Sequence, residues 1–264
     1  MRFARFILLS CFLSFVVPAW GQQAAVSSTE ATALLQKSLS ALAPAGLVSD
    51  VTLSGNVRRV AGSDDESGTG DFEAIASSVG RIDLNLSDGQ RSKVADLAGT
   101  VPSGSWTGPD GTPHALAYHN LLTDAAWFFP AFVIARRLST PGFVATYVGQ
   151  EVHDGQTVEH VSVYQQPPSG SGIDATTFAH LTRVDFYLDA TTLLPLATTF
   201  NVHPDDNMLL DIPVEVRFGD YRTASGMVVP YHVQKYINNT LFLDFQAQTV
   251  AVNSGLTASS LDAP

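Results

Sequence analysis

The stretch PVEVRFGDYRTASGMVVPYHVQKYINNTLFLDFQAQTVAVN, residues 213–253, contains three runs in which apolar and polar residues alternate. In the first run Val214, Val216 and Phe218 fall on one side of an extended chain. The two later runs are rich in β-branched and aromatic residues, which favour strands. Because a side-chain period of two is typical of strands with one buried face, the stretch predicts a three-stranded antiparallel meander.

The alternation continues upstream. Ile82, Leu84 and Leu86 alternate with polar residues, and Ser-Asp-Gly at 87–89 suits a hairpin turn. The total is about eleven antiparallel strands without regular alternation of strands and helices, which excludes a doubly wound parallel sheet. The upstream strands are predicted at residues 51–60, 70–78, 80–87, 90–94, 143–152, 158–165, 181–188 and 195–201.

Two segments predict helices. Ser27 and Glu30 form a capping box that opens a helix ending near residue 42, with an apolar stripe on one face. Residues 115–138, ALAYHNLLTDAAWFFPAFVIARRL, fit two helical pieces interrupted near Pro130. The preceding segment, 99–114, is rich in Gly, Pro, Ser and Thr and predicts an irregular loop.

Several short motifs mark hairpins in the C-terminal half, namely VDFYLD at 184–189, TLLP at 192–195, DY at 220–221, SG at 225–226, VP at 229–230 and NSGL at 253–256. Together they resemble the closing hairpins of the periplasmic lipoprotein-carrier-like (LolA/LolB-like) families, over roughly residues 29–256. The resemblance implies a curved, incomplete β-barrel whose concave face is covered by helices and accepts acyl chains. No binding motif of those families matches position by position, so no binding residue is carried over.

Composition excludes several classes of function. The chain of 264 residues has a net charge of −11, and its 14 Lys and Arg residues form no run longer than the pairs at 58–59 and 136–137. Nucleic acid requires clustered cations, so we expect no nucleic-acid binding and no adhesion to lipid by charge alone. The length suits one large all-β domain.

The N-terminus predicts export. Residues 1–21 combine Arg2 and Arg5 with an apolar run and a Pro-Ala-Trp-Gly end, which is typical of a signal peptide cleaved before Gln22. We expect a 22–28 linker, a single domain at 29–256, a tail at 257–264, no transmembrane segment in the mature chain, and a periplasmic or secreted location. Cys11, the one cysteine, falls in the leader; the alternative that it carries a lipid anchor stays open.

The segment around Pro130 holds the candidate ligand-binding residues, because it has more apolar surface than one narrow helix stripe needs. Two interpretations remain open: the aromatic side chains plug the sheet as ordinary core, or they line or gate a cavity for an apolar ligand. On the second interpretation the lining or lid residues are Leu122, Trp127, Phe128, Phe129, Phe132 and Val133.

Motifs of enzymes and metal sites are missing from the sequence, including those for nucleophilic serine, phosphate loops and zinc helices. His114 and His119 are the best metal pair but have no third ligand nearby. Asp64-Asp65-Glu66 lacks the ligand spacing of a calcium loop and predicts an exposed acidic hairpin tip. We therefore predict no catalytic residue, metal or cofactor.

These observations predict an exported bacterial binding or carrier protein for an apolar ligand, either lipid or lipidated protein, held between a curved sheet and helices. The alternative is a non-enzymatic envelope sensor or scaffold that uses the same fold to bind a protein partner.

Overall fold

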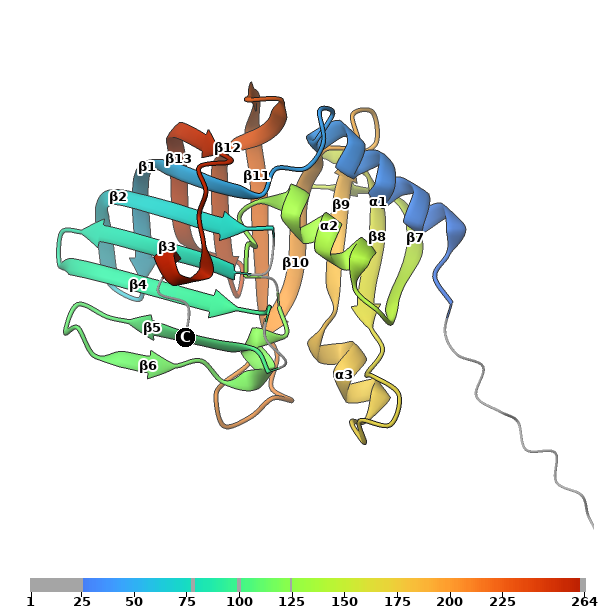
Figure 1. The fold of residues 1–264 in the computed structure, drawn as a ribbon, viewed down its shortest axis with the longest axis horizontal. Helices are drawn as coiled ribbons and strands as arrows, with labels where there is room; N and C mark the ends of the chain where they lie inside the picture. The colour runs from blue at the N-terminus through green and yellow to red at the C-terminus, as the bar shows by residue number, and fades with distance from the viewer. Residues whose placement is uncertain (1–25, 77–78, 99–100, 124, 262–264) are drawn as a thin grey trace, which may run out of the picture.

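A computed structural model describes residues 26–76, 79–98, 101–123 and 125–261 as one open antiparallel sheet of thirteen strands with three α-helices (Figure 1). The predicted fold class is confirmed, although two strands were missed. The strands are β1 (Asp50–Ala61), β2 (Asp64–Ile75), β3 (Val79–Leu86), β4 (Gly89–Asp96), β5 (Ser103–Thr107), β6 (Pro113–Ala115), β7 (Phe143–His153), β8 (Gln156–Gln165), β9 (Val184–Asp189), β10 (Pro195–Val202), β11 (Ile212–Ala224), β12 (Met227–Ile237) and β13 (Thr240–Val252).

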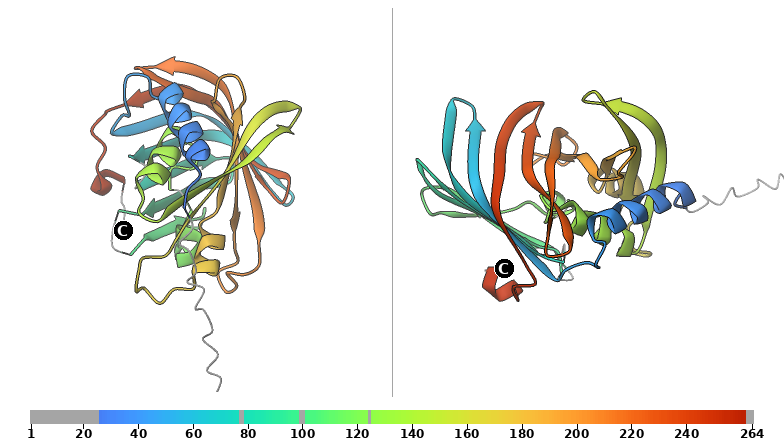
Figure 2. Two further views of the ribbon diagram at one scale, coloured as in Figure 1. Left: turned by 90° about the vertical axis from the view of Figure 1, so that its right-hand side faces the viewer. Right: turned by 90° about the horizontal axis from the view of Figure 1, so that it is seen from above.

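The sheet consists of two meanders, β1 to β6 and β7 to β13. The first strand of the domain, β1, pairs with the last, β13, and this pairing joins the two meanders into one sheet. Its order is β6-β5-β4-β3-β2-β1-β13-β12-β11-β10-β9-β8-β7, so β1 pairs with β13 while β6 and β7 form the two edges. The connection between these edges, residues 116–142, carries the helical segment. Its described parts, residues 116–123 and 125–142, lie on the concave side of the curved sheet (Figure 2).

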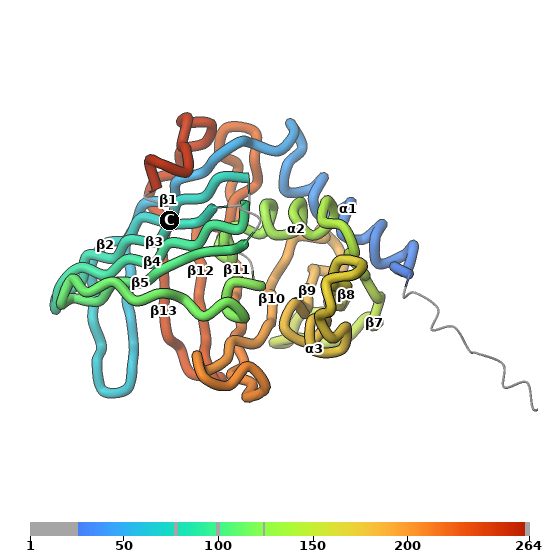
Figure 3. Tube along the Cα trace, turned by 60° about the horizontal axis from the view of Figure 1, so that its bottom comes forward, coloured from blue at the N-terminus to red at the C-terminus, as the bar shows by residue number. Residues whose placement is uncertain are grey.

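Helices cover the concave face. α1 (Thr29–Leu42) and α2 (Pro130–Ser139) pack against each other and against β7, and α1 also reaches β8 and β12 (Figure 3). The predicted stripe of α1 faces inward, with Ala31, Leu35 and Leu42 buried. The shorter helices are η1 (Tyr118–Leu121), α3 (Ala175–Leu181) and η2 (Ala258–Leu261).

The start of α1 differs from the predicted capping box. Ser28 is the N-cap residue, and its side chain accepts a hydrogen bond from the backbone N–H of Ala31. Ser27 instead donates to the Phe143 carbonyl and accepts from the Ala145 N–H, which fastens the helix to edge strand β7. The capping prediction was one residue early because tertiary contacts engage Ser27.

Three further segments correct the prediction. The supposed loop at 99–114 contains β5 and β6 in its described part; these short strands extend the edge at β4 without the apolar alternation that would reveal them. Helix α3 was missed, although Asp174 caps it by accepting from the Thr177 N–H at 2.7 Å, and the strand predicted from residue 181 begins at Val184.

The supposed acidic tip belongs to strand β2, which begins at Asp64. Arg58 donates to Asp65 at 2.7 Å, and Arg59 donates to Glu66 at 3.1 Å, so opposite charges align across the β1–β2 ladder. Asp64 and Asp65 are exposed beside the turn, as predicted, but Glu66 is buried, because arginine side chains compensate its charge.

The helical segment begins differently from the prediction. Pro130 is the first residue of α2, where its missing N–H costs nothing, and the first predicted helical piece contracts to the 3₁₀ turn η1. Just before Pro130, Phe128 enters the core and contacts Phe72 of β2 at 5.3 Å between ring centroids. Phe72 also contacts Phe245 of β13 at 4.1 Å, so the two meanders share one core.

The predicted signal peptide, the cleavage point before Gln22 and Cys11 lie outside the described residues. At the other end, Leu261 in the predicted tail is fully buried beside β3, where its carbonyl accepts from Arg81. Among the described residues, none of the helices is both long and apolar enough to cross a bilayer.

Candidate functional site

A cavity of about 390 Å³ lies between the β3–β5 strands and the β10, β12 and β13 strands, with the segment around η1 closing one side. Its volume falls in the range of small-molecule pockets, roughly 300–1,000 Å³. Apolar side chains form most of the wall, namely Ile82, Leu84, Ala95, Leu97, Trp106, Leu116, Leu121, Ala125, Trp127, Phe200, Val202, Ile237, Phe242 and Leu243.

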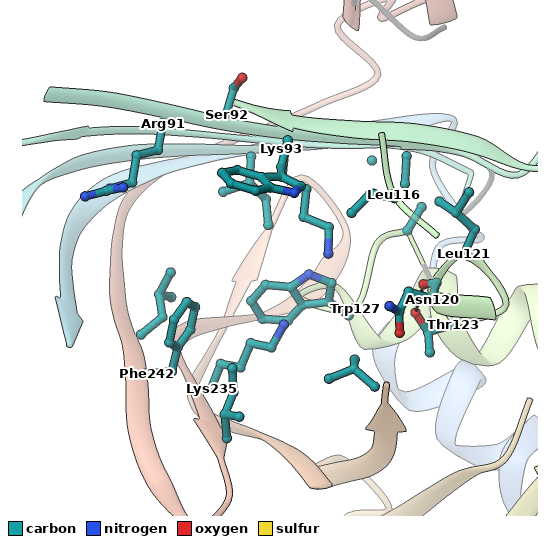
Figure 4. A pocket seen from close by; sticks show the side chains of 18 of the residues that line it. Arg91, Ser92, Lys93, Leu116, Asn120, Leu121, Thr123, Trp127, Lys235 and Phe242 are labelled. Carbon is teal, nitrogen blue, oxygen red and sulfur yellow. Dashed lines mark hydrogen bonds between the residues drawn. The ribbon is translucent and has the colours of Figure 1, made fainter. Parts of the chain in front are cut away.

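Two lysines enter this apolar cavity. Lys93 extends from β4 and Lys235 from β12, and both point toward the indole of Trp127 (Figure 4). The Lys235 amine lies 4.5 Å from the Trp127 ring centroid, a cation–π distance. Within the described part of the chain, neither amine has a carboxylate partner.

The surroundings disfavour the charged form of both amines. Burial lowers the pKa of Lys93; burial, followed by the nearby Lys93 charge, lowers the pKa of Lys235 to about 7. Lys93 is nevertheless exposed through the open side of the cavity, so its pKa is lowered by the crowding of protein atoms around the side chain and not by exclusion from water. The site therefore holds two amines whose pKa values both lie below the ordinary value of a lysine.

Two arginines also line the cavity but are already paired. Arg59 and Arg91 both contact Glu66, at 3.1 Å and 3.3 Å respectively, and Arg91 also bonds Asp88. The cavity wall therefore contains four basic residues, and none of its described residues is Asp or Glu. In a chain of net charge −11, the cavity wall thus gathers four basic side chains, two of them paired with carboxylates.

The structure separates the six residues predicted to bind ligand. Trp127 lines the cavity. Phe128, Phe129, Phe132 and Val133 are at most 3% exposed and belong to the main core. Leu122 packs elsewhere, in a small cluster with Phe178 and Leu181 of α3. Their role in ligand binding stays a prediction.

Sequence reasoning missed the two lysines. A signal for Lys235 was present in the alternation of β12. Lys235 falls on the same face of the strand as Val229, Val233 and Ile237, and Val229 and Val233 are buried. A lysine on the apolar face of a strand must either reach solvent or enter a cavity, and the sequence does not say which.

Three histidines, His119, His180 and His203, lie near one another beside the cavity, whereas the sequence suggested His114 and His119 as a pair. His114 stacks on Trp106 across β5 and β6, whereas His119 lies near His203, at 5.9 Å between ring centroids. The His114–His119 pair is therefore split. His180 and Asp211 join His203 in a group that could hold a metal ion; His180 Nε2 lies 2.8 Å from the Asp211 carboxylate.

The architecture defines a class: an open antiparallel sheet curved around helices, with an apolar cavity on its concave side. The chain matches no family model, and no curated protein matches it in sequence. Among solved structures, it is similar to a domain described as an outer membrane lipoprotein-sorting protein from Vibrio parahaemolyticus, with 9% identity, a TM-score of 0.54, and coverage of 88% of this chain and 96% of that one.

A LolA superfamily protein from Nitrosomonas europaea is similar to the same extent, with 9% identity, a TM-score of 0.53, and coverage of 88% of this chain and 96% of that chain. At such identities the likeness shows a shared fold. The resemblance noted in the hairpin motifs is thereby confirmed at the level of fold.

Proposed function

We propose that this protein is a non-enzymatic carrier or binding protein of the bacterial envelope for an apolar ligand, a lipid or the acyl chain of a lipidated protein. The observation that carries the proposal is the apolar cavity of about 390 Å³ on the concave face. A packed core leaves few voids larger than a water molecule, so a cavity of this size with aromatic and aliphatic walls suits a ligand. The fold shared with lipoprotein-sorting proteins supports the same class.

On this proposal the residues of the aromatic segment have two different roles. Trp127 contacts the ligand directly, while Phe128, Phe129, Phe132 and Val133 hold Trp127 in place by filling the core behind it. Leu122 fastens the same segment to α3. The two interpretations of the segment are then both correct, since some of its side chains pack in the core and Trp127 lines the cavity.

Native mass spectrometry of protein purified without detergent tests the proposal. We expect an acyl-bearing species to co-purify and a fluorescent fatty acid to rebind after its removal. Leu97→Trp, which adds a large ring to a partly buried cavity wall, should reduce probe binding at least tenfold. Leu209→Trp is the matched control, because Leu209 is 71% exposed and is not part of the cavity wall. Wild-type protein without ligand or probe binding would reject the carrier function.

The location is tested separately. The predicted leader implies that the mature chain begins at Gln22 and fractionates with the periplasm or medium. N-terminal sequencing checks this, and a diacylglyceryl group on Cys11 would instead establish the anchored alternative. The scaffold alternative would be favoured if delipidated protein still bound a defined envelope partner with unchanged affinity.

A further inference from the structure

We propose that Lys93 and Lys235 bind the anionic head group, carboxylate or phosphate, of a single-chain amphiphile whose tail occupies the apolar remainder of the cavity. This inference rests on the proposed apolar-ligand function and specifies the chemistry of the ligand. Nothing in the shared fold by itself requires a charged group at this place.

Placement of the lysines is the first argument. The chain has only three lysines, at 37, 93 and 235, and two of them enter the same cavity from strands on opposite walls. The side chains of Lys93 and Lys235 both point toward Trp127, although Lys93 is also exposed through the open side of the cavity (Figure 4). Two inward amines beside the Trp127 indole place positive charge on two sides of this part of the cavity, where an anion at the ring edge can approach both (Figure 4).

Lack of internal compensation is the second argument. Glu66 and Asp88 together compensate Arg59 and Arg91, but no described carboxylate reaches either lysine. Two like charges in an apolar cavity destabilise each other and the fold, unless a counter-charge arrives from outside. An anionic oxygen group supplies that charge and accepts hydrogen bonds from both ammonium groups.

Shape gives the third argument. The lysines lie midway along the cavity, and Leu116 and Leu121 line the wall beyond them (Figure 4). A head group held at the lysines therefore has apolar surface beside it. The volume of about 390 Å³ lies near the lower end of the small-ligand range of roughly 300–1,000 Å³, which suits one acyl chain rather than several.

The experiment compares amphiphiles with one tail and different heads: dodecanoate, dodecyl phosphate, dodecanol and dodecylamine, each below its micellar concentration. Binding is followed by tryptophan fluorescence, since Trp106 and Trp127 both line the cavity. We expect at least one anionic amphiphile to bind ten times more tightly than dodecanol, and dodecylamine to bind least. The ratio between dodecanoate and dodecyl phosphate distinguishes the two head groups.

Variants assign the preference to the lysines. The double change Lys93→Met and Lys235→Met should bring anionic and neutral amphiphiles within about twofold of each other while dodecanol still binds. The double change to Arg should keep the preference, because it keeps both charges. Lys37→Met is the matched control and should behave as wild type, because Lys37 lies on α1 and is not part of the cavity wall. Circular-dichroism melts verify that each variant is folded.

The results that overturn the inference are distinct from those that overturn the carrier function. Equal affinity for dodecanol and both anionic amphiphiles, or an anionic preference that survives the double Met change, removes the head-group site and leaves the carrier function standing. Acetate or inorganic phosphate binding as tightly as the amphiphiles removes the role of the tail. If no amphiphile binds, both proposals fail.

Discussion

At the turn between β11 and β12, two consecutive residues adopt left-handed backbone angles, Ser225 with φ of 49° and Gly226 with φ of 84°. Such angles are expected of a two-residue hairpin whose twist matches its strands. The Ser-Gly pair predicted the turn from sequence, and the structure confirms it. A Cβ atom at Gly226 would also lie 3.0 Å from the Cβ of Ala45, so space as well as angle restricts this position.

Gly226→Val should lower the free energy of unfolding by about 1–3 kcal/mol, because a β-branched side chain disfavours positive φ. A urea melt of the variant beside wild type measures the loss. Gly226→Asn adds a Cβ atom but tolerates the left-handed angle, so it should cost less than Val. Equal stability of all three proteins would contradict the assigned turn geometry.

Phe128 distinguishes the two interpretations of the aromatic segment, ordinary core or cavity lid. Its side chain is fully buried and contacts Phe72. We expect Phe128→Ala to destabilise the protein by about 3–5 kcal/mol, since burial is lost and a void remains. Urea melts measure the change, and Val148→Ala, at a side chain 54% exposed, should alter stability by less than about 0.5 kcal/mol. A loss below about 2 kcal/mol at Phe128 would instead favour a loosely packed lid.

At the scale of elements, the pairing of β1 with β13 holds the two meanders together. Asp50, the first residue of β1, is buried and accepts hydrogen bonds from Ser254 N–H and Oγ, both at 2.7 Å, and from Gly255 N–H at 3.1 Å. The NSGL motif noted in the sequence therefore has a partner at the opposite end of the domain. No local pattern around residue 50 indicates this contact.

Asp50→Asn should destabilise the fold by about 1–3 kcal/mol, because the amide cannot accept from all these donors. Burial raises the pKa of Asp50, but hydrogen bonds from Ser254, Ser49 and Gly255 outweigh it and leave the pKa below 3.8. The carboxylate therefore contributes stability above pH 3.8 that disappears as pH falls through the lowered value.

Urea melts at pH 7 and below pH 4 test this prediction. The variant should be less stable than wild type at pH 7, and the difference should shrink in acid. Asp206→Asn, at an exposed carboxylate, serves as the control and should change stability little at either pH. An Asp50→Asn protein as stable as wild type would show that the closing contact is dispensable.

At the scale of the whole molecule, stability and ligand binding compete inside the cavity. The lysines come from strands on opposite walls, and the helical segment brings Trp127 between the walls. Burial and the charge of Lys93 hold the pKa of Lys235 near 7, below its ordinary value of 10.5. The unfolded chain therefore binds more protons than the folded protein between these two values.

Wild-type stability should consequently rise with pH from about 7 upward, with a contribution from Lys235. Lys235→Met removes this contribution and should be more stable than wild type by at least about 1 kcal/mol at pH 7, with a smaller gain at pH 9.5. Lys93 has a lowered pKa too, so part of the slope should remain in the single variant. Urea melts from pH 6.5 to 9.5 measure both effects; a constant difference across this range would contradict them.

The sequence by itself determined the strands with strong alternation, their inward faces and the short turns between them. Val214, Val216 and Phe218 are buried as the period of two requires. These features depend on residues close together in the chain, whose side chains point to alternate sides of any strand. The class of fold follows from that local pattern together with the order of the hairpins.

Only the tertiary structure decided which strands became edges, that β5 and β6 extend one edge, and that the cavity holds two lysines. Phe128 and Trp127 are neighbours that both belong to the core, yet of the two only Trp127 also lines the cavity. Lys93 and Lys235 meet because distant strands face each other across the curved sheet. Contacts of this kind depend on strand order and curvature, which long-range packing decides and no short window of sequence contains.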